Sequence, residues 1–208
     1  MFALSSDDLH GRILGCADGP ASFNAEATAA GLSVVSCDPL YRFSADEIRQ
    51  RISETSDIII EQTRRNQDEF LWTSIRSIKE LQQLRMASME RFLADYEVGK
   101  QEGRYVDAGL PHLAFEDCAF DLALCSHFLF LYSEQFSEDF HIAALREMAR
   151  VATQVRVFPL LALGGKRSPY VGAVQQQLQT DGYEVSIETV PYEFQRGGNQ
   201  MIRVSRSE

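Results

Sequence analysis

The stretch that decides the fold is RILGCADGPASFNAEATAAGLSVVSCDPLY, residues 12–41. It predicts an apolar strand, a glycine turn from Gly15 to Gly19, an alanine-rich helix that ends at Gly31, and a second strand that ends at Asp38. Such a turn brings bare backbone N–H groups and the positive end of a helix close to a ligand. An acidic side chain at the tip of the next strand can accept hydrogen bonds from both hydroxyls of a ribose. The stretch therefore indicates a site for a cofactor that contains adenosine.

Length and charge narrow the class of protein. A chain of 208 residues that is 45% hydrophobic can bury one full core, so we expect a single domain over residues 1–208. The formal net charge is −10, and an acidic chain repels polyphosphate, so nucleic acid is not an expected partner. No apolar run is long enough to span a membrane, and acids stand where a signal peptide carries basic residues. A cytoplasmic protein that does not bind membranes is expected.

The chain has four cysteines, Cys16, Cys37, Cys118 and Cys125. They form no C-x-x-C pair, so neither a metal site nor dithiol chemistry is expected. Three of them fall near the carboxyl ends of neighbouring predicted strands, which predicts that they lie close together. We interpret them as small, buried, reduced thiols beside the cofactor, and a metal-binding or regulatory thiol is the alternative.

A long helical stretch, about residues 44–103, interrupts the alternation of strands and helices. Helices are predicted to begin at Ser44, near Ser56 and at about Ser74, and the last is predicted to end at Gly99 and Gly103. A crossover between parallel strands needs only about a dozen residues, so this stretch should form an appendage. It leaves the sheet at the edge where ligands of open α/β folds bind, which favours a lid over the substrate. The alternative is a helical arm through which the chain forms a homodimer.

Strands and helices alternate again after this insertion. The predicted strands are 104–107, 120–125, 155–163, 183–190 and 201–206, and the predicted helices begin at Ser137 and Ser168. The nine residues PYEFQRGGN between the last two strands cannot hold a crossover helix, so these strands should be antiparallel.

Several of these stretches match motifs of one known family. Residues 13–19 look like its glycine motif, and residues 37–39 (CDP) look like its acidic second motif. Residues 107–108 resemble its third-strand Asp-Ala, and residues 113–122 resemble the run that leads into its fourth strand. Residues 143–151 resemble the helix before its fifth strand. In these stretches the chain resembles the class I S-adenosylmethionine-dependent methyltransferases.

The resemblance covers nearly the whole chain except residues 44–103. It implies a Rossmann-like α/β fold: a seven-stranded sheet with five parallel strands, a C-terminal antiparallel hairpin and helices on both faces. The insertion then forms a helical lid or arm between the second and third strands. It also implies S-adenosylmethionine as the cofactor and methyl transfer as the reaction.

Two residues depart from the pattern of the family. Ala17 stands at the middle glycine, and Ile13 stands where the first strand commonly carries an acid. The family often uses that acid near the ammonium group of the methionine portion. Backbone carbonyls are expected to hold the ammonium here, or binding is expected to be weaker.

By this resemblance the residues that bind the cofactor are Gly15, Cys16, Ala17 and Gly19 (methionine and ribose), Asp38 (ribose hydroxyls), Leu40, Asp107 and Ala108 (adenine), and Ser126 (beside the sulfonium). His127 follows Ser126 at the end of the fourth strand, and its ordinary pKa suits it to act as a catalytic base. The alternative for His127 is a histidine at the edge of the core that is bonded to backbone.

The loops after the fifth and sixth strands share the edge of the sheet with the cofactor. Arg167, Tyr192, Arg196 and Asn199 lie in these loops and are predicted to bind the substrate. Arginines in an acidic chain favour a small-molecule acceptor that carries a carboxylate or phosphate, with a flat ring against the aromatic residues. The alternative is that these charges are ordinary solvent-exposed charges of loops and bind no substrate.

Two other functions compete with a methyltransferase. A catalytically inactive protein that binds the cofactor and acts as an interaction module through its helical arm is the first, because a fold does not fix its function. An NAD-dependent oxidoreductase is the second. It is disfavoured by the G-x-x-x-G spacing of Gly15 and Gly19, since the dinucleotide motif is G-x-G-x-x-G.

Overall fold

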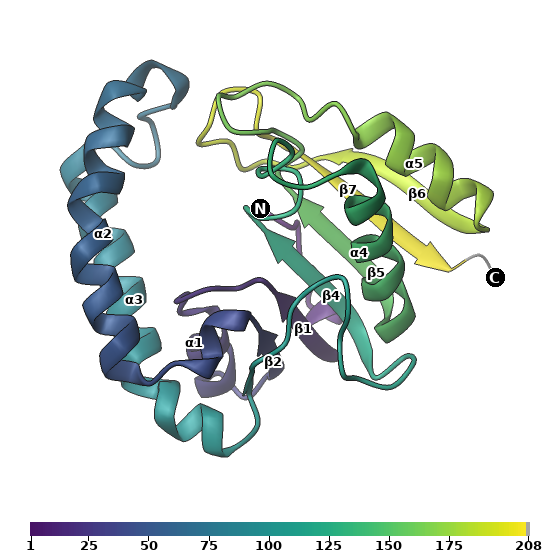
Figure 1. Ribbon diagram of the computed structural model, residues 1–208, viewed down its shortest axis with the longest axis horizontal. Coiled ribbons are helices and arrows are strands. Elements are labelled where there is room, and N and C mark those ends of the chain that lie inside the picture. Colours follow the sequence, from purple (N-terminus) through teal and green to yellow (C-terminus); the bar gives the residue numbers. More distant parts are fainter. Residues whose placement is uncertain (207–208) are drawn as a thin grey trace.

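Seven strands form one mixed sheet in the computed structural model, which describes residues 1–206 (Figure 1). The strand order is β3-β2-β1-β4-β5-β7-β6. The strands are β1 (Arg12–Cys16), β2 (Ser33–Cys37), β3 (Tyr105–Val106), β4 (Phe120–Ser126), β5 (Ala152–Phe158), β6 (Tyr183–Thr189) and β7 (Gln200–Arg206). The first five strands pair in parallel, and β6 and β7 form an antiparallel hairpin, as predicted. Strand β7 also pairs antiparallel with β5.

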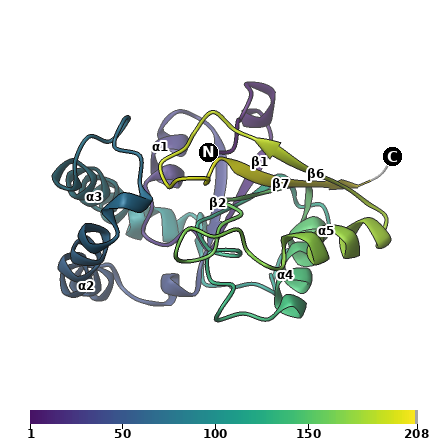
Figure 2. The same ribbon diagram turned by 90° about the horizontal axis from the view of Figure 1, so that it is seen from above.

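Helices cover both faces of this sheet. The α-helices are α1 (Phe23–Ala29), α2 (Ala45–Arg65), α3 (Ile78–Gln101), α4 (Glu138–Val151) and α5 (Val171–Thr180), and the short 3₁₀ helices are η1 (Asp7–Leu9), η2 (Pro39–Arg42) and η3 (Gln67–Glu69). Helices α4 and α5 lie on one face and α1 lies on the other (Figure 2). Within residues 1–206, none of the helices combines the length and the apolar character needed to cross a bilayer.

Side chains of β1 alternate between the two cores because successive residues of a strand point to opposite faces. Leu14 and Cys16 belong to the large cluster under α4 and α5. Ile13 belongs to the smaller cluster that includes Ala27 of α1. Gly15 therefore faces the α1 side of the sheet, as Ile13 does.

The insertion contains two long helices, so the prediction of a third helix was wrong. Ser44 opens α2 with the predicted capping box, but α2 continues through Ser56 to Arg65. The Ser56 hydroxyl lies 3.8 Å from the sulfur of Met86 in α3 and caps no new helix. Helix α3 begins at Ile78 rather than near Ser74, because Ser77 caps it by accepting a hydrogen bond from the Glu80 amide.

Two further predicted boundaries were displaced. Gly99 lies inside α3, where a Cβ would come within 2.5 Å of the Tyr105 ring, so this glycine allows close packing. Gly103, with φ +74°, follows the end of the helix. Strand β5 ends at Phe158 rather than at residue 163, since Pro159 has no N–H to continue the ladder.

We call residues 44–103 the strap, because the rest of the chain holds it at both ends. At its base, the Tyr96 hydroxyl donates to the carbonyls of Tyr41 (2.9 Å) and Phe43 (2.8 Å) within an aromatic cluster. At its tip, residues 66–77, the Leu71 amide donates to the Phe194 carbonyl at 2.7 Å. The tip therefore reaches the loop between β6 and β7, and the strap crosses beside the carboxyl edge of the sheet.

Candidate functional site

The order of the strands marks the candidate site. Chain order reverses between β1 and β4, which are hydrogen-bonded neighbours in the sheet. In open α/β sheets, ligands bind outside the carboxyl ends of the strands at such a reversal. The glycine turn follows β1 there, Asp38 follows β2, and His127 follows β4.

The glycine turn keeps its conformation without the middle glycine. Ala17 has φ +55° and Gly19 has φ +57°, both in the left-handed region. A left-handed backbone costs a residue with a Cβ about 1–2 kcal/mol. The Ala17 amide donates to the Cys37 carbonyl at 2.8 Å, which ties the strained residue to β2. The turn therefore points its backbone at the edge of the sheet despite the substitution.

Asp38 joins the glycine turn to the next segment. Its Oδ2 accepts from the Gly19 amide at 2.9 Å, and its Oδ1 accepts from the Leu40 amide at 2.7 Å. Each carboxylate oxygen has a second lone pair, so both can still accept from a ligand. Asp38 thus lies where a carboxylate predicted to bind ribose should lie, and it also stabilises the turn.

Asp18 is an acid in the same turn that the sequence analysis did not single out. A Cβ at position 15 would overlap its carboxylate, so Gly15 is required for this close approach. The Ser36 hydroxyl donates to Asp18 Oδ2 at 2.5 Å, whereas Oδ1 accepts no hydrogen bond from any residue between 1 and 206. Desolvation raises the pKa of Asp18 to about 6; the Ser36 hydrogen bond opposes the rise and nearby Asp38 adds to it.

The position of Asp18 bears on the acid that is missing from the first strand. Ile13 and Gly15 face the same side of β1, and the Asp18 carboxylate packs against Gly15 on that side. A carboxylate is therefore present beside the glycine turn, contributed from five residues further along the sequence. An acid inside a glycine turn was the available signal, but its direction depends on the left-handed backbone of Ala17.

A chain of polar groups, of which Ser36 and Asn24 are buried and the others half-buried, continues from Asp18 to the strap. Ser36 Oγ accepts from Asn24 Nδ2 at 3.1 Å, and Asn24 Oδ1 accepts from Arg104 Nη1 at 2.8 Å. Arg104 forms a bidentate pair with Asp95 of α3 at 2.7 and 2.8 Å, which lowers the pKa of Asp95. We call these five residues the polar chain.

Three cysteines lie side by side at this edge, as predicted. Cys16 of β1 is in register with Cys37 of β2 and with Cys125 of β4. All three are buried and free, and burial raises the pKa of Cys125 to about 12. A hydrogen bond to Cys37, together with burial, also raises the pKa of Cys16. Because the Cys16 side chain is buried in the core, only its backbone can face a ligand.

No metal centre is formed by these groups. Among residues 1–206, no three His, Cys, Asp or Glu side chains are grouped so that they could hold a metal ion. The fourth cysteine, Cys118, is exposed and lies elsewhere, before β4.

His127 has a strained backbone and a ring held on one side. Its φ is +53°, and its amide donates to the Phe158 carbonyl at 2.7 Å. Its Nδ1 lies 2.8 Å from the Ser126 hydroxyl. Desolvation, with smaller contributions from the charges of Arg85 and the N-terminal ammonium, lowers the pKa of His127 to about 4. The imidazole is therefore neutral at physiological pH.

The other predicted residues lie at or near the same edge. Asp107 is exposed and lies 3.6 Å from Arg42, whereas Leu40 and Ala108 are half-buried against neighbouring cores. Two of the predicted substrate residues are arginines with hydrogen bonds to the chain: Arg167 Nη1 donates to Gln200 at 2.7 Å, and Arg196 Nε donates to the Asp68 carbonyl at 2.8 Å. Asn199 donates to Glu193 at 3.4 Å. The Tyr192 ring packs on Phe158, with the two ring centroids 5.9 Å apart. Each of these four side chains already has a neighbour, and Arg196 helps to hold the tip of the strap.

Comparison with known proteins provides a family for this chain. No family model matches it. The uncharacterized protein MJ0045 of Methanocaldococcus jannaschii is 30% identical over 207 residues, which is 99% of this chain and 90% of that protein. The chain belongs to the MJ0045 family.

Solved structures identify the fold of this MJ0045-family protein. The magnesium protoporphyrin IX methyltransferase ChlM of Synechocystis PCC 6803 with bound SAM matches 97% of this chain and 72% of its own, with a TM-score of 0.50 and 11% identity. The mitomycin 7-O-methyltransferase MmcR matches 99% of this chain, which spans 51% of MmcR, with a TM-score of 0.52 and 15% identity. At these identities the likeness concerns the fold. The MJ0045-family chain has the Rossmann-like fold of class I methyltransferases, as predicted.

Proposed function

We propose that this chain is an S-adenosylmethionine-dependent methyltransferase that acts on a small, anionic or aromatic acceptor. The proposal rests mainly on the position and hydrogen bonds of Asp38. Its carboxylate lies at the tip of β2, is bonded to the glycine turn, and keeps lone pairs for the two ribose hydroxyls. The methyltransferase fold supports the same cofactor.

The residues around the turn fit the remaining parts of S-adenosylmethionine. The methionine and ribose portions would lie against the backbone of Gly15, Cys16, Ala17 and Gly19, the adenine against Leu40, Asp107 and Ala108, and the sulfonium beside Ser126. Asp18 Oδ1, which accepts no hydrogen bond within residues 1–206, is the acceptor that fits the methionine ammonium. Asp18 would thus replace the acid that Ile13 lacks.

The mechanism needs little beyond positioning. S-adenosylmethionine supplies a methyl group on a sulfonium, and an in-line displacement requires the acceptor atom to be aligned with it. Ser126 holds the His127 ring by its Nδ1. When Nδ1 donates to Ser126 Oγ, Nε2 has a free lone pair that can accept a hydrogen bond from the acceptor. A pKa lowered to about 4 makes this imidazole a weak base, so alignment contributes more to the reaction than proton removal does.

The strap and the rim loops would select the acceptor. Arg167 and Arg196 each use one side-chain nitrogen in a hydrogen bond to the chain, so their other N–H groups can bind an anionic group. Tyr192 and Asn199 would border the same opening. The strap is held at both ends, which favours a small molecule over a macromolecule.

Calorimetric titration with S-adenosylmethionine and S-adenosylhomocysteine tests the cofactor, beside the variant Asp38→Ala. Two lost hydrogen bonds to a charged group should weaken binding by about a hundredfold. Asp57→Ala removes the same charge from an exposed position in α2 and is the matched control. Because Asp38 also holds the turn, thermal melts must show that the variant is folded.

The outcomes separate the proposed functions. Absence of binding by a folded wild-type protein contradicts the proposed cofactor. Equal affinity of wild type and Asp38→Ala contradicts the proposed role of Asp38. Binding without methyl transfer to any acceptor would favour the interaction module, whose readout is dimer formation through the strap.

A further inference from the structure

Arg85 is a cation of the strap that has no acidic partner. The neighbouring arginines of the strap that pair with acids are Arg49, Arg51, Arg64, Arg65 and Arg91. Arg85 makes neither a hydrogen bond nor an ion pair within residues 1–206. Arg76, nearer the tip of the strap, also lacks an acidic partner for its side chain within residues 1–206. What distinguishes Arg85 is that all of its N–H groups are available beside a hollow in the surface.

The helix face that carries Arg85 looks toward the candidate site. Ser88 is three residues further along α3, so it lies on the same face. Ser88 Oγ accepts from the Ser22 amide at 3.1 Å and donates to the Ser22 hydroxyl at 3.0 Å. Ser22 directly precedes α1, just after the glycine turn. Arg85 lies one turn of α3 further toward the tip of the strap.

Electrostatics agree with this direction. The charge of Arg85 acts on both His127 and Tyr132, which follow β4. Arg85 is exposed to solvent, yet desolvation by the surrounding protein lowers its pKa. The guanidinium therefore lies close enough to the segment after β4 for its charge to act there.

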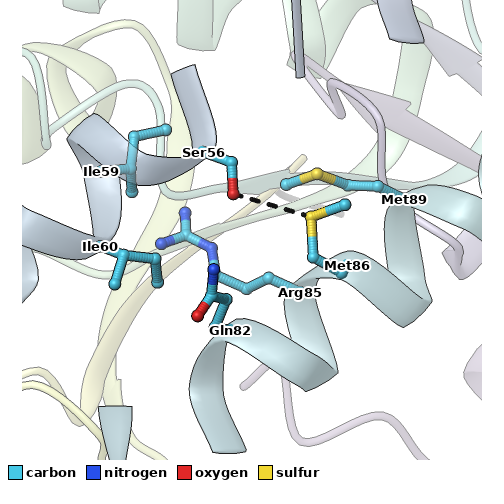
Figure 3. A pocket seen from close by; sticks show the side chains of 7 residues that line it. All are labelled: Ser56, Ile59, Ile60, Gln82, Arg85, Met86 and Met89. Atoms are coloured by element: carbon cyan, nitrogen blue, oxygen red, sulfur yellow. Dashed lines mark hydrogen bonds between the residues drawn. The ribbon is translucent and has the colours of Figure 1, made fainter. Parts of the chain in front are cut away.

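A small apolar hollow adjoins the guanidinium (Figure 3). It lies between α2 and α3 and is lined by Ser56, Ile59, Ile60, Gln82, Arg85, Met86 and Met89. Figure 3 shows the Arg85 side chain between the isoleucines of α2 and the thioethers of α3. The free volume is about 20 Å³, which holds about one water molecule, so an apolar group enters only when the methionine side chains move aside.

We propose that Arg85 and this hollow anchor the acceptor as an organic carboxylate, with its carboxylate on the guanidinium and its apolar part against Met86 and Met89. This rests on the proposed function and names the class of acceptor. A guanidinium binds a carboxylate through two parallel hydrogen bonds. The hollow has one cation and mostly apolar walls, which suits a singly charged amphipathic ligand better than a phosphate ester of charge −2. The acceptor atom would then extend from α3 toward His127.

The test uses phenylacetate and its neutral counterpart 2-phenylethanol as probes. The full-length protein, labelled with ¹³C in the methionine methyl groups, is titrated by NMR with S-adenosylhomocysteine present. We expect phenylacetate to shift the Met86 and Met89 signals and to bind about tenfold more tightly than the alcohol. In Arg85→Gln the tenfold preference should vanish. Arg91→Gln, which removes an exposed arginine of the same helix, should preserve the preference.

Three results would overturn the subsite: equal binding of acid and alcohol, unmoved Met86 and Met89 signals, or equal loss of preference in Arg91→Gln. The affinity for S-adenosylhomocysteine, measured separately by calorimetry, should be unchanged in Arg85→Gln. Failure of that ligand to bind the wild-type protein contradicts the proposed function and the acceptor role that rests on it. Normal cofactor binding without selectivity for phenylacetate contradicts only the subsite.

Discussion

The glycine turn and the tip of the strap border the same edge of the sheet but are stabilised differently. The turn is fixed by hydrogen bonds to Asp18 and Asp38, within a chain of buried and half-buried polar groups. The tip is held by half-buried aromatic rings and by a few backbone hydrogen bonds. The ring centroids of Phe70 and Trp72 lie 5.0 Å and 5.5 Å from that of Phe194. The cofactor side is therefore built as a fixed surface. The tip, which borders the proposed acceptor side, depends on contacts between aromatic rings that are each worth only about 0.5–1.5 kcal/mol.

The largest effect is expected from breaking the polar chain at Asn24. Asn24→Ala removes hydrogen bonds from Asn24 to the Val34 carbonyl, the Ser36 hydroxyl, and the carbonyl and guanidinium of Arg104, whereas Ser36 keeps Asp18 and Arg104 keeps Asp95. At about 0.5–1.5 kcal/mol for each lost hydrogen bond, we expect the free energy of unfolding to fall by about 2–4 kcal/mol. Chemical denaturation measures this change. The control is Thr28→Ala, which removes only a 3.4 Å bond to Asn24 and should cost under about 1 kcal/mol. If the free energy of unfolding fell by similar amounts in both variants, the polar chain would not stabilise the fold as proposed.

A smaller effect is expected from the charge of Asp18, and it has opposite signs for binding and for stability. With a pKa raised to about 6, Asp18 is ionised at pH 7.5 and protonated at pH 5. The affinity for S-adenosylhomocysteine, which carries the same ammonium, should fall about tenfold between these pH values. In Asp18→Asn this pH dependence should disappear.

Stability should change in the other direction. A carboxyl group whose pKa is raised on folding stabilises the protein below its unfolded pKa, and this contribution is lost as pH rises through the folded pKa. Asp18→Asn should therefore be more stable than wild type at pH 7.5 and equally stable near pH 4, as measured by thermal melts. The titratable groups that face Asp18 are Asp38, Tyr41, Cys16 and Cys125. Unchanged pH dependence in Asp18→Asn would show that Asp18 is not the group responsible.

The smallest effect on global stability is expected at the tip of the strap. Phe194→Ala removes two aromatic contacts worth about 0.5–1.5 kcal/mol each, between partly exposed groups. Hydrogen exchange of the Leu71 amide, which donates to the Phe194 carbonyl, should accelerate about tenfold. The Gly19 amide, bonded to Asp38, should keep its rate. Equal acceleration at both amides would show that the turn and the tip open together.

The fold could be predicted because its signals are local. A glycine turn, an acid after the second strand and a nine-residue link between the last strands each restrict the backbone by themselves. The break predicted near Ser56 was wrong because a serine inside a helix can face a neighbouring helix instead of capping. Helix periodicity alone could not separate the two cases.

The site was predictable only in part because its side chains depend on distant contacts. The direction of Asp18 follows from the left-handed backbone of Ala17. The inward face of Arg85 follows from the contact of Ser88 with Ser22, which is 66 residues away in sequence. Arg196 was predicted to bind substrate from its loop alone, and its hydrogen bond to Asp68 depends on where the strap ends. No local pattern encodes these three placements.

Helix α3 is attached to the rest of the molecule at three successive points. Asp95 pairs with Arg104, Arg91 pairs with Glu26 of α1, and Ser88 contacts Ser22. Arg85 lies three residues beyond the last of these contacts, about 4.5 Å along the helix at 1.5 Å per residue. An attached helix fixes the origin of a long side chain, so little backbone freedom is lost when the guanidinium binds a ligand. The backbone of Arg85 is therefore positioned before any ligand arrives, and only its side-chain rotamer remains to be selected.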